Sequence, residues 1–277
     1  MPGKPTGTRD DADAAAITAV RAEILRRIPK GTVPGDFFTG VLRRAIDEIL
    51  TLNLRRFEIS QLDAPEQTYI GTRSEILVRE GLDVGIGTRA DTLIAGHEVD
   101  IKWSKRLNWM IGPENIGTVC LGIGTNPTQE LLSVGLFVPH ADQLGAQNRD
   151  RKYTAGASFR SRHVSWLVQN ASLPPNFIET LPDAIRERIM SGGSAQERMQ
   201  RFAELVPNTP VPRAALQFVS LNKDDFMRRV RDDKSRRSPP LGDMVCLSWK
   251  YRKDILQRLG IVLKKNEFVF VNRSRLS

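Results

Sequence analysis

Two aspartates and a lysine lie close together in the segment DTLIAGHEVDIKWS, residues 91–104. The Ala-Gly pair at 95–96 predicts a two-residue turn between two antiparallel strands. Counting outward from that turn places Asp91 directly opposite Asp100. Side chains in this arrangement have Cβ atoms about 5 Å apart, and two like charges there are destabilising. The hairpin therefore needs a compensating positive charge, and a divalent cation is the obvious candidate.

The second strand of the hairpin adds another charged group to the same face. Residues two apart on a strand share a face, so Asp100 and Lys102 point the same way. Two carboxylates are suitable ligands for Mg²⁺, which also binds waters and phosphate oxygens. Such a metal can polarise a phosphodiester and help to generate hydroxide, and a nearby lysine can stabilise the charge of the transition state. The segment thus favours metal-dependent phosphodiester hydrolysis by Asp91, Asp100 and Lys102.

The pattern alone leaves other interpretations of these residues open. Asp-x-Lys also occurs in exposed strands that carry only an ion pair, although apolar residues alternate with the charges here and favour a half-buried strand. Glu98 lies on the same side as Asp100 and is an alternative metal ligand. Glu75 follows Thr72 by three positions, which fits a capping box at a helix start. Glu75 could instead supply a third acidic group to the site.

Composition limits the classes of protein to which the chain can belong. Its 277 residues are 40% hydrophobic and 26% charged, which is ordinary for a globular protein of one or two domains. No apolar run approaches the ~20 residues that span a bilayer, and the N-terminus has no apolar core of signal-peptide type. Cys120 and Cys246 are far apart and suit a reducing compartment. We therefore expect a cytoplasmic protein without a membrane partner.

The positive charge is concentrated near the C-terminus. The chain has a net charge of +9, and residues 221–277 contain 15 lysines and arginines against 7 acidic residues. A basic segment attached to a nearly neutral body suggests a polyanion partner, most often nucleic acid, although a basic surface that serves only solubility is the alternative. The three histidines are scattered, which argues against a zinc site.

Hydrophobic periodicity predicts an α/β fold for the first half of the chain. Helical patterns cover residues 14–28, 34–54 and 71–80. Beyond the hairpin, residues 114–124 and 131–139 have the composition of buried strands. We expect these elements to form a central mixed sheet flanked by helices.

A proline-containing stretch indicates a boundary between two domains. We predict an endonuclease-type domain over 1–168, with a disordered segment at 1–12, a linker over 169–180 and a smaller domain over 181–277. A basic helix that runs straight into a two-stranded wing is the layout of a winged helix, a DNA-binding variant of helix-turn-helix. The helices and the final hairpin are expected at 181–190, 195–206, 222–233, 248–260 and 261–271.

Five motifs, in the same order over roughly residues 40–235, resemble those of the NaeI-type restriction endonucleases. The motifs are YIGTRSEI, IAGHEVDIKWS, ENIGTVCL, NRDRK and DDFMRRVR. The Asp-x8-Asp-x-Lys arrangement within them resembles that of the PD-(D/E)xK nuclease superfamily. The resemblance implies a PD-(D/E)xK nuclease core followed by a winged-helix domain of CAP-like type.

The resemblance also implies roles for individual residues. Carried over motif by motif, the catalytic set is Glu75, Asp91, Asp100 and Lys102. The implied cofactor is Mg²⁺, held by Asp91, Asp100 and the backbone carbonyl of Ile101, with Glu75 reached through a water.

Basic and amide side chains in two regions are candidates for DNA contacts. Arginine can bond guanine and asparagine can bond adenine in a bidentate way, but most such side chains contact phosphates. We therefore expect most of the candidates to position the duplex and one or two to read bases. The candidates are Asn148, Arg149, Lys152, Arg160 and Arg162 in the first domain, and Arg228, Arg229, Arg231, Lys250, Arg252 and Lys253 in the second.

Together these features predict a type II restriction endonuclease that hydrolyses double-stranded DNA at a short palindromic site. The resemblance implies a homodimer, activation by a second DNA site, and a methyltransferase that protects host DNA as a functional partner. Two alternatives remain from the sequence. One is a mismatch-repair or nicking endonuclease with the same chemistry, and the other is a DNA-binding regulator with a vestigial nuclease core.

Overall fold

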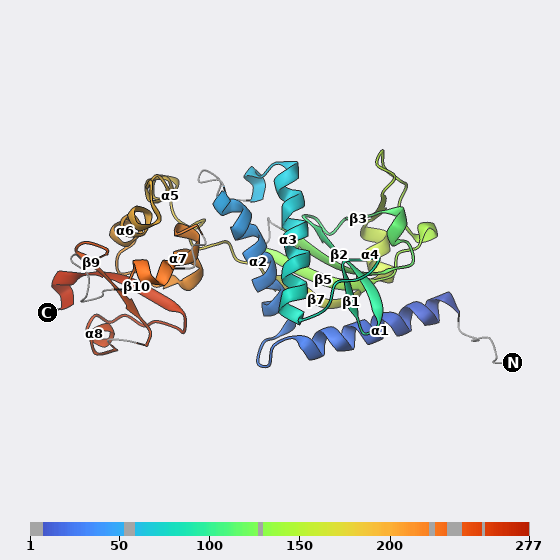
Figure 1. The fold of residues 1–277 in the computed structure, drawn as a ribbon, viewed down its shortest axis with the longest axis horizontal. Coiled ribbons are helices and arrows are strands. Elements are labelled where there is room, and N and C mark those ends of the chain that lie inside the picture. Colours follow the sequence, from blue (N-terminus) through green and yellow to red (C-terminus); the bar gives the residue numbers. More distant parts are fainter. Residues whose placement is uncertain are drawn as a thin grey trace. The chain divides into compact units, whose positions relative to one another are not determined.

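The computed structural model describes residues 8–52, 59–126, 130–221, 225–231, 240–250 and 253–276. The chain divides into two compact units (Figure 1). The first unit comprises Met1–Ala45 and Asp63–Pro174, and the second comprises Ile46–Leu62 and Pro175–Ser277. Within the described ranges, no helix combines the length and the apolar character that crossing a membrane requires.

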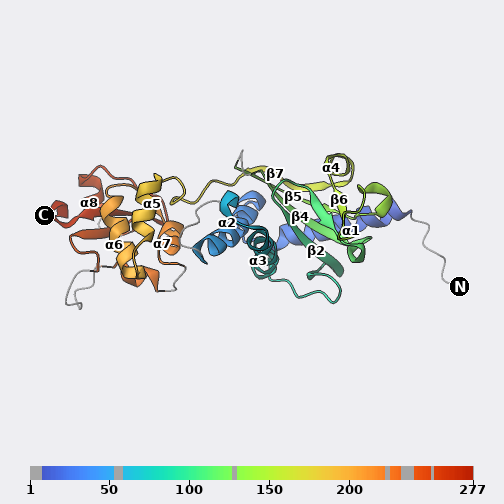
Figure 2. The ribbon, with the colours of Figure 1, turned by 90° about the horizontal axis from the view of Figure 1, so that it is seen from above.

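A five-stranded mixed sheet forms the centre of the first unit. Its strands are β1 (Thr92–Ile94), β2 (His97–Ser104), β4 (Val119–Asn126), β5 (Leu131–Phe137) and β7 (Ser165–Ser172), in the order β1-β2-β4-β5-β7. Figure 2 shows β2, β4, β5 and β7 in this order across the sheet. Strands β2 and β4 are parallel, and the other neighbouring pairs are antiparallel. The predicted α/β fold with a mixed sheet is confirmed.

The hairpin between β1 and β2 has the predicted turn. Ala95 and Gly96 both have positive φ, at 51° and 79°, as a type I′ turn requires. Ile94 pairs with His97, and Thr92 pairs with Val99. Because this register continues outward by one residue on each strand, the position that precedes β1 lies next to Asp100.

Three long helices accompany the sheet, and each of them contacts it. They are α1 (Arg9–Arg27), α2 (Pro34–Leu52) and α3 (Ala64–Leu82). Helix α3 packs along β2, and α1 contacts β1, β4 and β5 (Figure 1). Residues 9–12, which were predicted to be disordered, belong to α1. The reason is a capping box at Thr8 and Asp11, which starts the helix earlier than the apolar periodicity indicates.

Helix α3 begins well before the predicted capping box. The Asp63 side chain caps the helix by accepting the backbone N–H of Glu66. The Glu66 side chain in turn accepts the backbone N–H of Asp63. Thr72 and Glu75 therefore lie inside a continuous 19-residue helix, and the capping interpretation of Glu75 is wrong. A proline in the first turn also favours a helix start at that point.

A small antiparallel pair and a short helix complete the first unit. The pair consists of β3 (Trp109–Ile111) and β6 (Tyr153–Ala155), and the helix is α4 (Ala157–His163). Trp109 and Phe159, both buried, pack with Phe137 and other apolar side chains in one cluster. The short 3₁₀ helices of the described chain are Ile59–Gln61, Pro113–Asn115, Ala141–Gln143, Phe226–Arg229 and Arg273–Leu276.

The second unit combines short helices with a three-stranded antiparallel sheet. The helices are α5 (Asp183–Met190), α6 (Ala195–Leu205), α7 (Arg213–Val219) and α8 (Lys253–Arg258). The strands are β8 (Val211–Pro212), β9 (Met244–Ser248) and β10 (Glu267–Asn272), in the order β8-β10-β9. Helices α5 and α6 confirm the two helices that were predicted there.

The predicted end of the second unit needs correction. The helix expected over 248–260 is the shorter α8, and the hairpin expected over 261–271 is instead β10 paired with β9. The run Met-Val-Cys-Leu-Ser of β9 lies upstream of the predicted helix, and its apolar side chains pack against those of β10. In the segment predicted as a helix over 222–233, the described part is a 3₁₀ helix at Phe226–Arg229, and 222–224 and 232–233 lie outside the described residues.

Candidate active site

An acidic residue and a lysine form an ion pair along β2. The Nζ atom of Lys102 lies 2.8 Å from Oδ1 of Asp100. Asp100 is only 4% exposed, whereas 26% of the Lys102 side chain is exposed. The alternation of strand residues thus places both groups on one face, as predicted, with the lysine at the open side.

Asp91 is fixed against the same strand from the end of the hairpin. Its Oδ2 accepts the backbone N–H of Ile101 at 2.6 Å. Arg79 of α3 donates to the backbone carbonyl of Asp91 at 2.9 Å. Asp91 directly precedes β1, so the register brings it beside Asp100, as the turn position predicted.

Glu75 reaches these residues from the middle of α3. Burial raises its pKa, and the negative charge of Asp91 raises it further, while Lys102 acts in the opposite direction. The resulting pKa is about 7, against an ordinary value of 4.5. The charges of Asp91 and Lys102 therefore act on Glu75, although burial is the larger cause of its raised pKa. We refer to Glu75, Asp91, Asp100 and Lys102 as the charged cluster.

The other members of the charged cluster influence one another in the same way. Burial raises the pKa of Asp100 to about 6, although Lys102 opposes that change. Burial alone would lower the pKa of Lys102, but the carboxylates of Asp100 and Asp91 outweigh it and raise that pKa. Lys102 is therefore a cation at neutral pH, and the three carboxyl groups repel one another across a partly buried space.

A thiol lies behind Asp100 in the core. The parallel register pairs Asp100 with Cys120 of β4, and Sγ of Cys120 lies 3.8 Å from Oδ2 of Asp100. Burial raises the pKa of the Cys120 thiol well above its usual range, so it stays neutral and can donate its weak S–H bond. The inner oxygen of Asp100 thus faces the thiol, and the other oxygen faces Lys102.

Glu98, the alternative metal ligand, has a different environment. Its carboxylate accepts the backbone N–H groups of Thr88, Arg89 and Ala90 at 2.9, 3.2 and 3.0 Å. The bonds from Ala90 and Thr88 lower the pKa of Glu98. Both oxygens are engaged by the loop, so the structure does not favour Glu98 as a ligand.

The donor set of the charged cluster suits Mg²⁺ better than a metal that needs many side chains. Over the residues that the structure describes, no three His, Cys, Asp or Glu side chains are arranged to hold a metal ion by themselves. Mg²⁺ needs only one or two carboxylates and takes water and phosphate oxygens for the rest. Asp91 and Asp100 meet this requirement, and their mutual repulsion with Glu75 would be relieved by a divalent cation.

Comparison with known proteins gives these residues a context. The sequence model of the family described as "Restriction endonuclease NaeI" matches residues 19–272. The chain belongs to the NaeI family of restriction endonucleases. The type II restriction enzyme NaeI of Lentzea aerocolonigenes is 32% identical over 212 residues, which cover 74% of this chain and 67% of that protein. Membership of the NaeI family makes the chain a site-specific deoxyribonuclease.

The candidate DNA contacts of the first unit fall into two groups. Arg149, with 96% of its side chain exposed, and Lys152 lie on an open loop and can approach a duplex. Asn148 and Arg160 organise the protein itself. Asn148 Oδ1 accepts the N–H groups of Asp150 and Lys152, and Arg160 binds the backbone carbonyl of Leu107 at 2.8 Å.

The remaining candidates differ in how far they are engaged within the chain. Arg162 is exposed on the surface of α4, where it donates hydrogen bonds to Ser158 of the same helix. In the second unit Arg229 forms an ion pair with Asp225 at 2.9 Å. Of the candidates in this unit, Arg228, Arg231, Lys250 and Lys253 are exposed. Arg252 lies outside the described residues.

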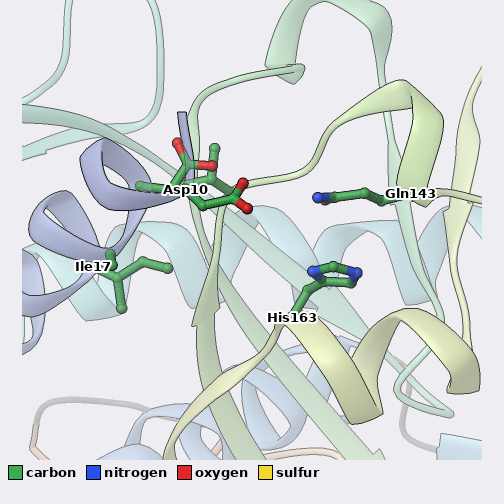
Figure 3. A pocket seen from close by; sticks show the side chains of 7 residues that line it. Asp10, Ile17, Gln143 and His163 are labelled. Carbon is green, nitrogen blue, oxygen red and sulfur yellow. The ribbon is translucent and has the colours of Figure 1, made fainter. Parts of the chain in front are cut away.

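A pocket of about 170 Å³ lies in the first unit, apart from the charged cluster. It is lined by the start of α1, by residues around Gln143 and by His163. Figure 3 shows Gln143 and His163 on one side of the pocket, with Asp10 and Ile17 of α1 on the other. Asp13, also in its lining, pairs with His140 at 2.7 Å, which ties α1 to the neighbouring loop.

Sequence reasoning missed the residues that hold Asp91 and Asp100 in place. The guanidinium of Arg79 and the thiol of Cys120 reach the charged cluster only through tertiary packing. No spacing rule connects these positions with the hairpin. The apolar neighbours of Cys120 indicate burial but give no sign of a contact with Asp100.

The repulsion within the charged cluster predicts a pH-dependent stability in metal-free protein. Between its ordinary pKa of 4.5 and its folded-state pKa of about 7, Glu75 keeps its proton only in the folded state. Stability therefore falls as the pH rises through this range and stays low above it. Because Glu75→Gln removes that loss, its advantage over the wild type should grow from pH 5 to pH 8. Urea denaturation in EDTA measures this, and an advantage independent of pH would contradict the assignment.

Proposed function

We propose that the chain hydrolyses phosphodiester bonds of double-stranded DNA at a short site, with Mg²⁺ as cofactor. The observation that supports this most is the meeting of Asp91, Asp100 and Lys102 at one end of the hairpin, with Glu75 beside them, in a member of a restriction endonuclease family. The arrangement is that expected of a PD-(D/E)xK nuclease core. Its exposed side is where a scissile phosphate would lie.

The proposed ligands are Asp91, Asp100 and the backbone carbonyl of Ile101. The N–H and C=O of a strand residue face the same neighbouring strand. The N–H of Ile101 binds Asp91, so its carbonyl is directed to the side of Asp91 as well. When bound, Mg²⁺ would supply charge to polarise the phosphate and to lower the pKa of a bound water.

Lys102 and Glu75 have separate roles in the proposal. Lys102 is a cation at the open side of the site, where its ammonium group can stabilise the negative charge that develops on the phosphate. Glu75, on α3, is proposed to hold a water molecule beside the metal ligands, because the charges of Asp91, Asp100 and Lys102 all act on its pKa. Both act from rigid elements, a helix and a central strand, which keeps the geometry constant.

Cleavage of both strands favours a symmetric arrangement of two chains. A palindromic site presents the same phosphate environment on each strand, and a two-fold homodimer places one charged cluster at each. Such an enzyme requires a methyltransferase that protects the same site in host DNA. The palindrome, the dimer and the methyltransferase are parts of this proposal.

The second unit is proposed to be a winged-helix domain that binds DNA. Helices α6 and α7 pack together, and the antiparallel strands β9 and β10 carry the connection that would form the wing. Exposed Arg228 and Arg231 follow α7 in the chain, and Lys250 and Lys253 lie on the β9–β10 connection. This distribution of charge would suit phosphate contacts and, by extension, a second DNA site that activates cleavage.

A cleavage assay tests the proposal. Purified protein is incubated with unmethylated plasmid and phage DNA in Mg²⁺, with EDTA as control. Discrete fragments in Mg²⁺ alone would support a site-specific endonuclease. Nicked circles without linear product would favour the nicking alternative. Retarded DNA without any cleavage would favour the DNA-binding regulator and contradict the proposal.

Mg²⁺ is also expected to stabilise the protein in the absence of DNA. A cation that binds only the folded state shifts the unfolding equilibrium, and here it also relieves the repulsion between Asp91, Asp100 and Glu75. We expect Mg²⁺ to raise the melting temperature of the wild type by several degrees. Differential scanning calorimetry with and without Mg²⁺ measures the shift. An equal shift for Asp91→Asn would show that the ion binds elsewhere.

A further inference from the structure

The loop that leads into Asp91 is wrapped around a single carboxylate. Oε1 of Glu98 accepts the N–H of Thr88 at 2.9 Å. Oε2 accepts the N–H groups of Arg89 and Ala90 at 3.2 and 3.0 Å. Hydrogen bonds to an ionised acceptor are roughly twice as strong as neutral ones. Three consecutive peptide units are thereby tied to β2 immediately before Asp91.

A glycine makes this wrapping possible. A Cβ at Gly87 would overlap Oε2 of Glu98 and lie 2.5 Å from the carbonyl oxygen of Ala90. Real Cβ atoms do not approach other atoms so closely, so glycine is required at this position. The loop is also closed at its base, where the N–H of Leu93 donates to the carbonyl of Gly85 at 3.2 Å. The glycine-rich stretch of the sequence thus serves to pack the loop on Glu98.

The restraints on Asp91 come from both sides of its backbone. The residue before it, Ala90, donates its N–H to Glu98. Its own carbonyl is held by Arg79 at 2.9 Å, and one carboxylate oxygen is held by the N–H of Ile101. Without the bonds to Glu98, residues 88–90 would lose the restraints on their own backbone, and Asp91 would be held only by Arg79 and by the N–H of Ile101.

We propose that Glu98 is a positioning residue that holds the Asp91 carboxylate where it binds the catalytic cation, acting through the amides of Thr88, Arg89 and Ala90. This inference rests on the proposed function, because it assigns a role through a metal ligand of that site. Glu98 thus has a role in positioning Asp91 and is not itself a metal ligand.

Two variants test the positioning role of Glu98, one by changing its carboxylate and the other by changing the loop that binds it. Glu98→Gln places an amide NH₂ group against backbone donors, and Gly87→Ala pushes the loop away from the carboxylate. Loss of groups that orient metal ligands typically costs about 10–100-fold in metal affinity or activity. We expect the Mg²⁺ concentration for half-maximal cleavage to rise about 10-fold or more in both variants, with a smaller change in the rate at saturating Mg²⁺.

A second measurement does not depend on activity. Hydrogen–deuterium exchange in metal-free, DNA-free protein reports directly on the amides of residues 88–90. Both variants should exchange faster there than the wild type. The matched control is Glu66→Gln, which neutralises the carboxylate that accepts the N–H of Asp63 at 2.9 Å at the start of α3 and so weakens that bond. It is expected to lower stability without changing the Mg²⁺ requirement.

The possible results separate this inference from the proposed function. A wild-type Mg²⁺ requirement in Glu98→Gln, together with faster exchange at 88–90, would overturn the positioning role and leave the proposed function intact. The same increase in Glu66→Gln would reduce the effect to general destabilisation and would also overturn it. A wild type that neither cleaves DNA nor responds to Mg²⁺ would overturn the proposed function and the inference with it.

Discussion

Replacement of Asp100 by asparagine is expected to reduce DNA cleavage by about 1,000-fold or more, because in the proposed site the metal would lose a charged ligand, and with it several kcal/mol of stabilisation of the transition state. Asparagine keeps the shape of the side chain, so folding should persist. The buried carboxylate has a pKa raised to about 6, and its removal relieves the cost of ionising it. The variant should therefore melt at or above the wild-type temperature in EDTA. Gel cleavage assays and calorimetry on the same preparation measure both effects.

The control for this variant is an aspartate of the same unit outside the charged cluster. Asp142 has 65% of its side chain exposed and pairs with Arg9 at 3.4 Å. Asp142→Asn should cleave DNA at nearly the wild-type rate, because a surface ion pair contributes little. Cleavage by Asp100→Asn within 10-fold of the wild type would remove Asp100 from the catalytic set.

Replacement of Lys102 by methionine is expected to reduce cleavage by roughly 100–1,000-fold, the usual effect of removing one group that stabilises transition-state charge. Methionine retains the apolar stem of the side chain, so packing along β2 should change little. DNA binding, measured by gel retardation in Ca²⁺, should stay close to the wild type. The loss should appear in the single-turnover rate rather than in the DNA concentration for half-saturation.

A lysine that directly follows the same strand provides the matched control. Lys105→Met removes an equal charge only three residues later in the chain and leaves the pair of Lys102 and Asp100 in place. We expect less than about 3-fold change in its single-turnover rate. Equal losses in the two lysine variants would indicate that the net positive charge of the strand matters and that Lys102 has no specific role.

The arrangement of the hairpin could be predicted because its determinants are local. A two-residue turn at Ala95 and Gly96 sets the register of both strands, and the register places Asp91 beside Asp100. The period of two along β2 then puts Lys102 with Asp100. Each step needs only a few neighbouring residues, so the sequence carried enough information.

The supporting residues could not be predicted, because they depend on packing between distant segments. Glu75 matched a capping box as well as an active-site role, and only the full length of α3 excludes the first. The bonds from Arg79 to Asp91 and from the loop amides to Glu98 require the helix and the hairpin to be placed together. No periodicity rule reports such contacts.

The prediction for the end of the second unit was wrong for a related reason. The prediction extended a helix over 248–260, whereas β9 ends at Ser248 and α8 is short. Strand β9 is stabilised by its pairing with β10, and that partner lies beyond a connection that contains α8. Strand formation through a distant partner leaves only a weak signal in a short apolar run.

The most direct test of the central claim is anomalous diffraction from crystals of the protein soaked in Mn²⁺, which replaces Mg²⁺ at oxygen sites. The account predicts an anomalous peak in contact with the carboxylates of both Asp91 and Asp100. A peak confined to another acidic region, such as the one around Asp10 and Asp13, or no peak at the hairpin at saturating Mn²⁺, would contradict it.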